Sequence, residues 1–351
     1  MSAPRVLIIG ANGQIGTELA EALVARHGAP AVVTSDIAPV GRLPEVTHEE
    51  LDVTDAAALA TVVERHGITQ AYLLAAALSA KGEQNPQRAW TLNMNGLLNV
   101  LELARARRLE RVFWPSSIAA FGPGTPASAD QTTVMDPTTV YGISKLAGER
   151  WCAWYHANHG VDVRSLRYPG LISWKTPPGG GTTDYAVEMF HAALRSAHYT
   201  SFLAADTRLP MMYMPDAVRA TLELMEAPAG RIAERGSYNV AGISFTPCEL
   251  AAAIARRLPG FTLDCAPDFR QAIAASWPAV VVDEAARRDW GWAPRYDLEA
   301  MVDEMLAALR GMAGDGCRSR GRVAAAIEQA PAAEACTDPA VAAGPEQAGS
   351  H

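Results

Sequence analysis

Short apolar runs alternate with longer helical patterns through the first half of this chain, and this alternation limits the folds available to it. Candidate strands rich in β-branched residues are expected at residues 6–9, 31–36, 71–76, 111–117 and 161–168. Between them, apolar residues recur at three- and four-residue spacing in residues 14–26, 56–65, 86–107 and 140–159. Strands separated by helices form right-handed crossovers and hence a parallel sheet with helices on both faces. The pattern therefore predicts an α/β fold with a doubly wound parallel sheet.

The rest of the chain predicts two further parts. After a Gly/Pro-rich loop at residues 177–181, mixed helices and short strands continue to about residue 310. We expect residues 1–175 to form the Rossmann core and residues 176–310 a smaller substrate-binding lobe interleaved with it, over the carboxyl ends of the strands. Residues 311–351 are rich in Ala, Gly and Pro and lack large apolar anchors, which predicts a disordered tail.

Composition excludes several classes of protein. A net charge of -8 gives no general positive field for nucleic acid or an anionic membrane. The five cysteines lie far apart without a Cys-x-x-Cys pair, which argues against a zinc site or a disulfide framework, and no metal is expected. With neither a leader peptide nor an apolar segment long enough to span a membrane, the chain is expected to be cytoplasmic.

A glycine-rich turn joins the first strand to the first helix and predicts a dinucleotide site. Its sequence is Gly10-Ala-Asn12-Gly13-Gln14-Ile15-Gly16. Glycines permit a tight turn and a close approach of the backbone to a pyrophosphate, whose charge is favoured at a helix N-terminus. Asp36 ends the second strand about 20 residues later, where a carboxylate accepts hydrogen bonds from ribose hydroxyls and repels a 2′-phosphate. The combination predicts NAD rather than NADP.

Tyr141 and Lys145 lie four residues apart in a helical pattern, so their side chains share one face. A phenol has a pKa of about 10, and lowering it to about 7 requires roughly 4 kcal/mol of preferential stabilisation of the phenolate. A lysine ammonium and an oxidised nicotinamide ring are the two plausible sources. A serine hydroxyl at the end of the preceding strand, where Ser116 and Ser117 lie, is expected to orient the reacting oxygen. Ser117 is chosen because it is the second serine of a Ser-Ser-x-Ala-x-Phe-Gly run that resembles the strand-end motif of the extended short-chain dehydrogenases. These three residues predict alcohol oxidation by a tyrosinate base.

These motifs resemble those of the extended short-chain dehydrogenases, to which the Gly-x-x-Gly-x-x-Gly spacing and the Ser-Ser-x-Ala-x-Phe-Gly run from residue 116 are similar. Within that group, several stretches resemble the short-chain-type L-threonine 3-dehydrogenases. They are residues 114–118 (Trp-Pro-Ser-Ser-Ile), 168–173 (Tyr-Pro-Gly-Leu-Ile-Ser), 179–186 (Gly-Gly-Gly-Thr-Thr-Asp-Tyr-Ala) and the methionine-rich residues 209–216. The resemblance implies oxidation of the β-hydroxyl of L-threonine to 2-amino-3-ketobutyrate, with hydride passing to NAD and the proton to Tyr141.

The same resemblance implies roles for further residues. Thr182 joins the catalytic group, and Ser79, Ser117, Tyr141, Thr182 and Trp277 would surround the amino acid. Asp52 and Val53 would contact the adenine, and the segment Leu74, Ala75, Ala76 would lie under the nicotinamide ribose. Ile37, Tyr168 and Leu171 complete the expected cofactor contacts. The amides of Gly179 to Gly181 are also expected to suit a small carboxylate. Family habit implies a homodimer through helices near residues 92–105 and 141–159.

Two other functions share these motifs. A nucleotide-sugar epimerase or dehydratase uses the same fold, glycine loop and Tyr-Lys pair, and Arg208 could clamp its diphosphate. A non-catalytic NAD sensor needs no working base, so intact Tyr141, Lys145 and Ser117 argue against it. Asp52 could instead simply cap the helix that starts near Asp55, and the alanines at 75 and 76 could belong to the core.

Overall fold

The computed structural model describes residues 3–177 and 179–312, without the side chains of residues 79–81. Met1–Leu309 forms one compact unit, and the described residues of the remainder, 310–312, are helical. The predicted tail begins at residue 311. Its residues 313–351 lie outside the described residues. The boundary expected at residue 175 stays a prediction.

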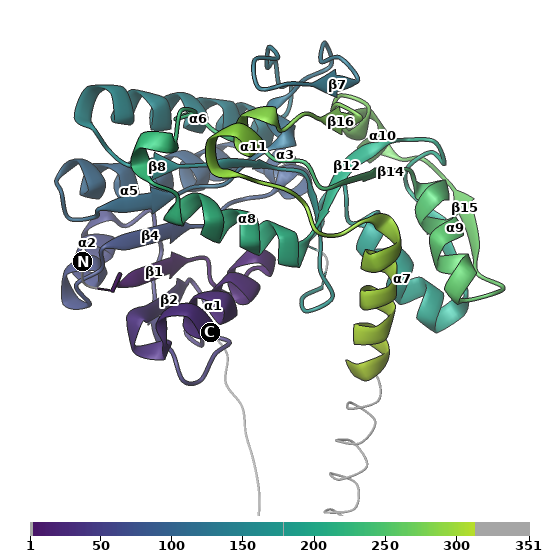
Figure 1. Ribbon diagram of the computed structural model, residues 1–351, viewed down its shortest axis with the longest axis horizontal. Helices are drawn as coiled ribbons and strands as arrows, with labels where there is room; N and C mark the ends of the chain where they lie inside the picture. The colour runs from purple at the N-terminus through teal and green to yellow at the C-terminus, as the bar shows by residue number, and fades with distance from the viewer. Residues whose placement is uncertain (1–2, 178, 313–351) are drawn as a thin grey trace, which may run out of the picture. The chain divides into compact units, whose positions relative to one another are not determined.

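A central sheet of six parallel strands confirms the predicted fold class (Figure 1). Its order is β3-β2-β1-β4-β5-β8, so the chain starts in the middle of the sheet and winds outward in both directions. Such a reversal of strand order places a crevice at the carboxyl ends of the strands. The strands are β1 (Val6–Ile9), β2 (Val32–Asp36), β3 (Thr47–Glu50), β4 (Gln70–Leu73), β5 (Arg111–Phe113) and β8 (Val163–Arg164).

Helices cover both faces of this sheet, which explains why β1 is apolar at every position. Val6 and Ile8 pack into one core with residues of α1 (Gln14–His27), α8 (Met214–Glu226) and α11 (Glu284–Trp290). Leu7 and Ile9 pack into a second core on the opposite face. The helices of that face are α2 (Ala56–Arg65), α5 (Gly96–Arg105) and α6 (Val140–His159).

A third core lies outside the central sheet and belongs to the second half of the chain. It is built on the strands β10 (Gly170–Ile172), β12 (Leu209–Tyr213) and β14 (Ile243–Phe245), with β11 (His198–Ser201) paired to β15 (Thr262–Cys265). Helices α7 (Tyr185–Ser196), α9 (Pro247–Arg257), α10 (Phe269–Ala274) and residues 298–309 supply the remaining apolar side chains.

Small elements connect these cores. The strands β6 (Ser116–Ser117), β9 (Leu166–Tyr168) and β13 (Tyr238–Asn239) form one sheet, and β7 (Ser128–Ala129) pairs with β16 (Val280–Val281). The remaining elements are α3 (Ser79–Gln84), α4 (Pro86–Trp90), the π-helical turn η2 (Thr91–Asn95) and the 3₁₀ turns η1 (Ala29–Ala31), η3 (Ile118–Ala120) and η4 (Ala229–Arg231).

Several predicted elements are divided in the structure. The strand expected at 111–117 breaks at Pro115, which cannot donate a ladder hydrogen bond, so β6 starts a new sheet beside β9. The strand expected at 161–168 also breaks, at Ser165, because β8 belongs to the central sheet and β9 to the sheet that contains β6. The helix expected at 86–107 contains η2. The sequence pattern missed β3, a polar edge strand.

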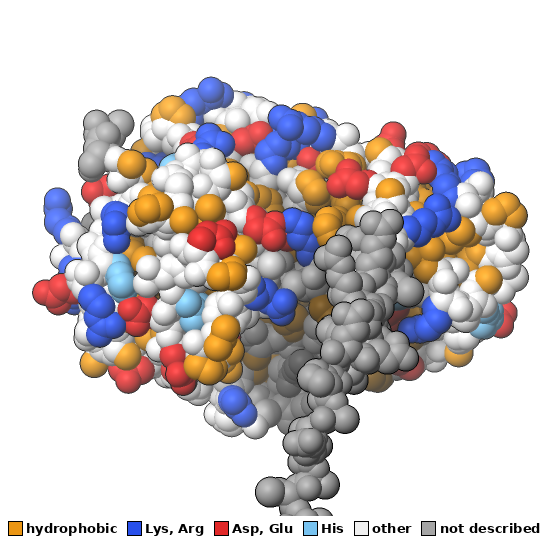
Figure 2. Space-filling model, turned by 90° about the horizontal axis from the view of Figure 1, so that it is seen from below, with side chains coloured by type: hydrophobic (Ala, Val, Ile, Leu, Met, Phe, Trp, Pro, Cys, Tyr) orange, Lys and Arg blue, Asp and Glu red, His pale blue; other side chains and the backbone are white. Residues whose placement is uncertain are grey.

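The surface in Figure 2 carries acidic and basic side chains interspersed among apolar ones, without one large area of a single charge. Across residues 3–177 and 179–312, no helix combines the length and the apolarity that crossing a membrane requires.

Candidate active site

The glycine turn after β1 has the conformation that a dinucleotide site requires. Gly10 has φ of 84°, and a Cβ there would lie 2.6 Å from the main-chain nitrogen of Ala75. A Cβ on Gly16 would lie 2.5 Å from the carbonyl oxygen of Gly10. Gly13 is the N-cap of α1 and has no side chain, so no side-chain oxygen occupies the first N–H groups of that helix. A tight turn, a close backbone approach and an open helix N-terminus fit a pyrophosphate.

Asp36 lies beside this turn, as the sequence predicts. Its Oδ2 accepts a hydrogen bond from the main-chain N–H of Asn12 at 3.1 Å, and Oδ1 accepts one from Ala38 at 3.2 Å. The Asn12 side chain donates to the carbonyl of Val40 at 2.9 Å, and its buried Oδ1 has no donor within the described part of the chain. Ile37 is 70% exposed next to the carboxylate. An acid, an unpartnered amide oxygen and an exposed apolar side chain fit the adenosine half of a dinucleotide.

Asp52 and Val53 lie at the start of the loop before α2. The helix cap belongs to Asp55, whose side chain accepts from Ala57 and Ala58, so Asp52 is not the cap. Asp52 instead accepts hydrogen bonds from the N–H and hydroxyl of Thr54, which lower its pKa. The Val53 side chain is 2% exposed and belongs to the core, and its carbonyl accepts from Asn99. Any adenine contact of Val53 is therefore left to its main-chain N–H.

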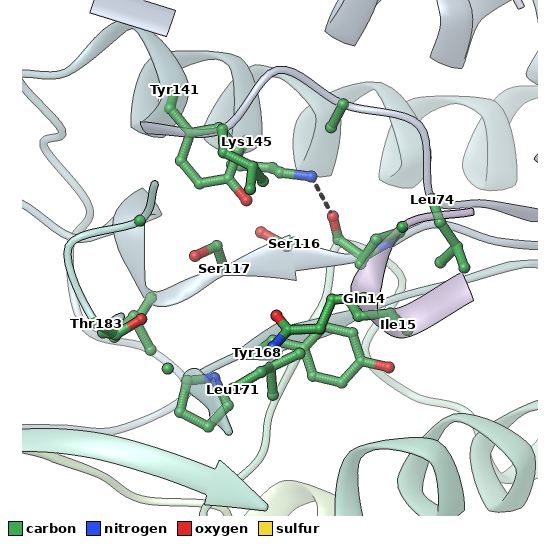
Figure 3. A pocket seen from close by; sticks show the side chains of 18 of the residues that line it. Gln14, Ile15, Leu74, Ser116, Ser117, Tyr141, Lys145, Tyr168, Leu171 and Thr183 are labelled. Carbon is green, nitrogen blue, oxygen red and sulfur yellow. Dashed lines mark hydrogen bonds between the residues drawn. The ribbon is translucent and has the colours of Figure 1, made fainter. Parts of the chain in front are cut away.

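A cavity opens at the carboxyl ends of the central strands and is lined by most of the predicted site residues (Figure 3). The predicted residues along its wall are Gly10, Gly13, Gln14, Ile15, Gly16, Leu74, Ala76, Ser117, Tyr141, Lys145, Tyr168, Leu171, Thr182 and Trp277. The predicted residues that do not line it are Asn12, Asp36, Ile37, Asp52, Val53 and Ala75. The side chain of Ser79 lies outside the described residues.

Tyr141 lies in the first turn of α6 and Ser117 at the end of β6, and both point into the cavity (Figure 3). The Thr139 side chain caps α6 by accepting from the N–H of Gly142 at 3.1 Å. Burial raises the pKa of Tyr141 to about 12, and the neighbouring Ser117 hydroxyl opposes that rise. The protein groups alone therefore keep this phenol protonated at neutral pH.

Lys145 does not act on the phenol through a direct hydrogen bond. Its Nζ donates to the main-chain carbonyl of Pro115 at 2.6 Å (Figure 3). The ammonium lies 4.6 Å from the ring centroid of Trp114 and 5.3 Å from that of Tyr141. Burial lowers the pKa of Lys145 to about 7, so its charge is easily lost or gained near neutral pH.

The glycine-rich segment before α7 is organised by Asp184. The Asp184 carboxylate accepts hydrogen bonds from the N–H groups of Gly180 at 2.7 Å and Gly181 at 2.6 Å. The expectation that these two amides hold a substrate carboxylate is therefore wrong, because a carboxylate of the chain already occupies them. Burial raises the pKa of Asp184, which itself lines the cavity. The buried hydroxyl of Thr182 has no protein partner among the described residues.

Two residues that organise the site, Asp184 and Asn93, were not predicted from the sequence. Asn93 lies in the π-helical turn η2 and donates to Ser144 Oγ at 3.0 Å, and its Oδ1 accepts from the N–H of Ala77 at 2.8 Å. It thereby ties the loop after β4 to α6, one residue before Lys145. A helical period gives no sign of a π turn, whereas Asp184 was present within the run that carried the resemblance.

Tyr168 and Leu171 reach the cavity from strands β9 and β10. The Tyr168 hydroxyl is directed to Thr221 and Ala217 of α8, so only its ring faces the cavity. Arg208 is absent from the cavity wall. It donates to the carbonyl of Ser244 at 2.8 Å and forms an ion pair with Glu249.

Comparison with known proteins links this site to a family. The model of the NAD dependent epimerase/dehydratase family matches residues 6–241. An uncharacterized epimerase/dehydratase of Staphylococcus haemolyticus is 46% identical over 313 residues, which are 87% of this chain and 97% of that protein. A GalE-like L-threonine dehydrogenase of Cupriavidus necator, solved in its holo form, is 68% identical with a TM-score of 0.86, covering 87% of this chain and 100% of its own. A monomeric L-threonine 3-dehydrogenase from a metagenome, solved in its apo form, is 44% identical with a TM-score of 0.85, covering 88% of this chain and 99% of its own.

Proposed function

Since the chain belongs to the NAD dependent epimerase/dehydratase family, we propose that it oxidises the β-hydroxyl of L-threonine to 2-amino-3-ketobutyrate with reduction of NAD. The observation that carries this proposal is the convergence of Ser117, Tyr141 and the unpartnered Thr182 hydroxyl on one cavity beside the glycine turn. The identity of 68% to a protein described as an L-threonine dehydrogenase supports the choice of substrate.

The dinucleotide would be held by the turn from Gly10 to Gly16 and by Asp36, with Leu74, Ala76 and Leu171 along the cavity. Asp52 and the main chain of Val53 would extend the site towards the adenine. When bound, oxidised NAD accepts a hydride and supplies a positive charge near the phenol. Asp36 selects NAD because a 2′-phosphate would bring a second negative charge against its carboxylate.

The chain's own residues would manage the proton. Tyr141 takes the hydroxyl proton of the alcohol, and Ser117 orients that oxygen by a hydrogen bond. Burial opposes ionisation of Tyr141, so the positive charges of Lys145 and of bound oxidised NAD would both be needed to favour the phenolate. As the C–H bond breaks, the carbon becomes a carbonyl, one hydride leaves to the dinucleotide and one proton remains on Tyr141.

The amino-acid end of threonine finds complementary groups on the other wall of the cavity. The Thr182 hydroxyl can donate to the substrate carboxylate, which would satisfy a buried group that has no partner among residues 3–177 and 179–312. Asp184 offers a carboxylate to the α-ammonium group, and an opposite charge would offset its burial. Trp277 contributes an apolar surface for the small side chain. Ser79 remains a proposed contact.

The epimerase alternative is less well supported. An epimerase must hold a sugar diphosphate, and the arginine suggested for that role, Arg208, is paired with Glu249 away from the cavity wall. A test measures NADH formation by the purified protein with a panel of L-amino acids and, separately, sugar nucleotides. We expect NADH with L-threonine. Tight binding of a UDP-sugar, with the dinucleotide retained through turnover, would support the epimerase instead.

We also infer that two copies associate through α5 and α6. Ile143, Trp151 and Trp154 of α6 are 44%, 39% and 46% exposed, although they are apolar. Exposed aromatic residues gathered on one helix mark an interaction surface. Because a relative of 44% identity is described as monomeric, sedimentation of the wild-type protein and of W154S is decisive. A dimer weakened by W154S supports this interface, and a wild-type monomer at all concentrations contradicts it.

A further inference from the structure

A buried carboxylate lies below the site on the helix that carries Tyr141 and Lys145. Glu149 is 2% exposed and follows Lys145 by one helical turn and Tyr141 by two, so the three side chains share one face of α6. It does not line the cavity. Its Oε1 accepts hydrogen bonds from Ser116 Oγ at 2.5 Å and Arg167 Nε at 2.8 Å, and Oε2 accepts one from Arg167 Nη2 at 2.7 Å.

The two partners of Glu149 belong to the strands that present the site. Ser116 directly precedes Ser117, and β6 pairs with β9 so that Ser116 faces Arg167 and Ser117 faces Tyr168. Alternate residues of a strand point to opposite faces. Ser117 and Tyr168 line the cavity, and Ser116 also reaches its wall, while the hydroxyl of Ser116 and the guanidinium of Arg167 fasten this strand pair to α6 through Glu149.

Arg167 extends the connection beyond the catalytic helix. Its Nη1 donates to Asn239 Oδ1 at 2.9 Å. Asn239 in turn donates to the carbonyls of Ala129 at 3.4 Å and Val282 at 3.2 Å, next to the strand pair β7 and β16. A buried ion pair with all its hydrogen bonds satisfied holds a specific geometry, and removal of one partner leaves an uncompensated charge.

Glu149 also acts on the charge of Lys145. Three titratable groups near Lys145 lie on the same helix, α6: Tyr141, Glu149 and Cys152. The guanidinium of Arg167, on β9, is paired with the carboxylate of Glu149. Burial is the largest effect and lowers the pKa of Lys145, whereas Cys152 and Glu149 both raise it. Burial also raises the pKa of the Cys152 thiol, so this thiol carries no negative charge near neutral pH and Glu149 is the carboxylate left to favour the ammonium. Pro115 and Trp114 contribute only a carbonyl oxygen and a ring face.

We propose that Glu149 is a positioning residue, which fastens the Ser117 end of β6 to α6 and favours the ammonium form of Lys145. It touches neither substrate nor cofactor and acts through these two side chains. The kinetic part of this inference rests on the proposed function.

The lysine part is tested without any activity measurement. The chain contains three lysines, Lys81, Lys145 and Lys175, so protein with ¹³C-labelled lysine gives three resolvable side-chain signals, and K145M assigns the relevant one. We expect the Lys145 titration midpoint to fall by about one pH unit or more in E149Q. The matched control is D216N, which neutralises another buried carboxylate paired with an arginine, Arg219, and should leave the midpoint unchanged. An unchanged midpoint in E149Q would overturn this part of the proposal.

The positioning part is tested by kinetics with L-threonine and NAD. S116A removes the hydroxyl bonded to Glu149 and also alters the cavity wall, so it is read together with E149Q, whose side chain lies outside the cavity lining. In both variants kcat should fall about 10- to 100-fold while both KM values change less than about threefold, since a misplaced catalytic group slows the chemical step. In E149Q the acid limb of the kcat profile should also move to higher pH. D216N should lower the melting temperature and leave kcat and the pH profile as in the wild type. Wild-type kcat and pH profile in both S116A and E149Q would contradict the proposal.

Two further outcomes can also be interpreted: a variant that does not fold, and a wild-type protein that is inactive with L-threonine. If E149Q does not fold, the double variant E149Q/R167Q replaces the ion pair with two neutral amides, and the Lys145 midpoint is again expected to fall. If the wild type forms no NADH from L-threonine, the proposed function fails, and the lysine titration still decides whether Glu149 controls Lys145.

Discussion

Lys145 donates its hydrogen bond to the carbonyl of Pro115, two residues before Ser117, so the charged group of α6 is anchored to the strand end that carries the serine. The ammonium has this single oxygen as its hydrogen-bond acceptor in the described structure and is 3% exposed. A charge in such surroundings is unfavourable for folding. The role proposed for Lys145 in catalysis would therefore come at the expense of stability.

This conflict predicts a pH-dependent stabilisation by K145M. The pKa of Lys145 is about 7 in the folded protein and 10.5 in the unfolded chain, so the unfolded state binds its proton more tightly. The free-energy cost of burying the charged ammonium is complete below pH 7 and disappears as the pH rises towards 10.5. We expect K145M to be about 1–3 kcal/mol more stable than the wild type at pH 6, with a smaller difference at pH 10. Thermal unfolding at both pH values measures this, with K175M as the matched control at a partly exposed lysine. A difference that grows with pH would be evidence against it.

Asp36 predicts the choice between the two dinucleotides. In D36S the carboxylate that opposes a 2′-phosphate is removed together with the acceptor of the Asn12 N–H, while the glycines of the turn stay. The ratio of kcat/KM for NAD to that for NADP should fall about 10- to 100-fold, or about 1.4–2.7 kcal/mol. D52N is the control, because a contact to the adenine affects both dinucleotides equally. If D36S leaves the ratio as in the wild type, Asp36 does not discriminate between NAD and NADP.

The alternation of strands and helices, the glycine turn and Asp36 were readable from the sequence because each follows from local periodicity or from a spacing that chemistry fixes. The whole of α6, residues 140–159, was predicted with the bounds that it has. The break at Pro115 and the change of sheet at Ser165 depend on which strand lies alongside, and periodicity carries no such information. For the same reason the bond between Asp184 and the glycine amides was missed.

Thr182 predicts a loss of substrate recognition when its hydroxyl is removed. T182V keeps the shape of the side chain but has no donor for the threonine carboxylate. We expect kcat/KM for L-threonine to fall about 10- to 100-fold, since a charged group of the substrate loses a buried partner. T182S retains the hydroxyl and should recover most of the activity. Equal loss in both variants would assign Thr182 a packing role.

The variant Y141F distinguishes a catalytic dehydrogenase from a non-catalytic NAD sensor. Y141F keeps the ring and removes the only group proposed to accept the proton. NADH formation should fall about 10²- to 10⁴-fold, whereas the affinity for NAD measured by calorimetry should change little. A Y141F protein with wild-type turnover would show that another group is the base.

The transfer of the C3 hydrogen tests the central claim most directly. The purified protein is given L-threonine deuterated at C3 together with NAD, and the reduced dinucleotide is analysed by mass spectrometry. The account predicts NADH that carries one deuterium, formed together with 2-amino-3-ketobutyrate. Unlabelled NADH, or no reduced dinucleotide at all, would contradict it.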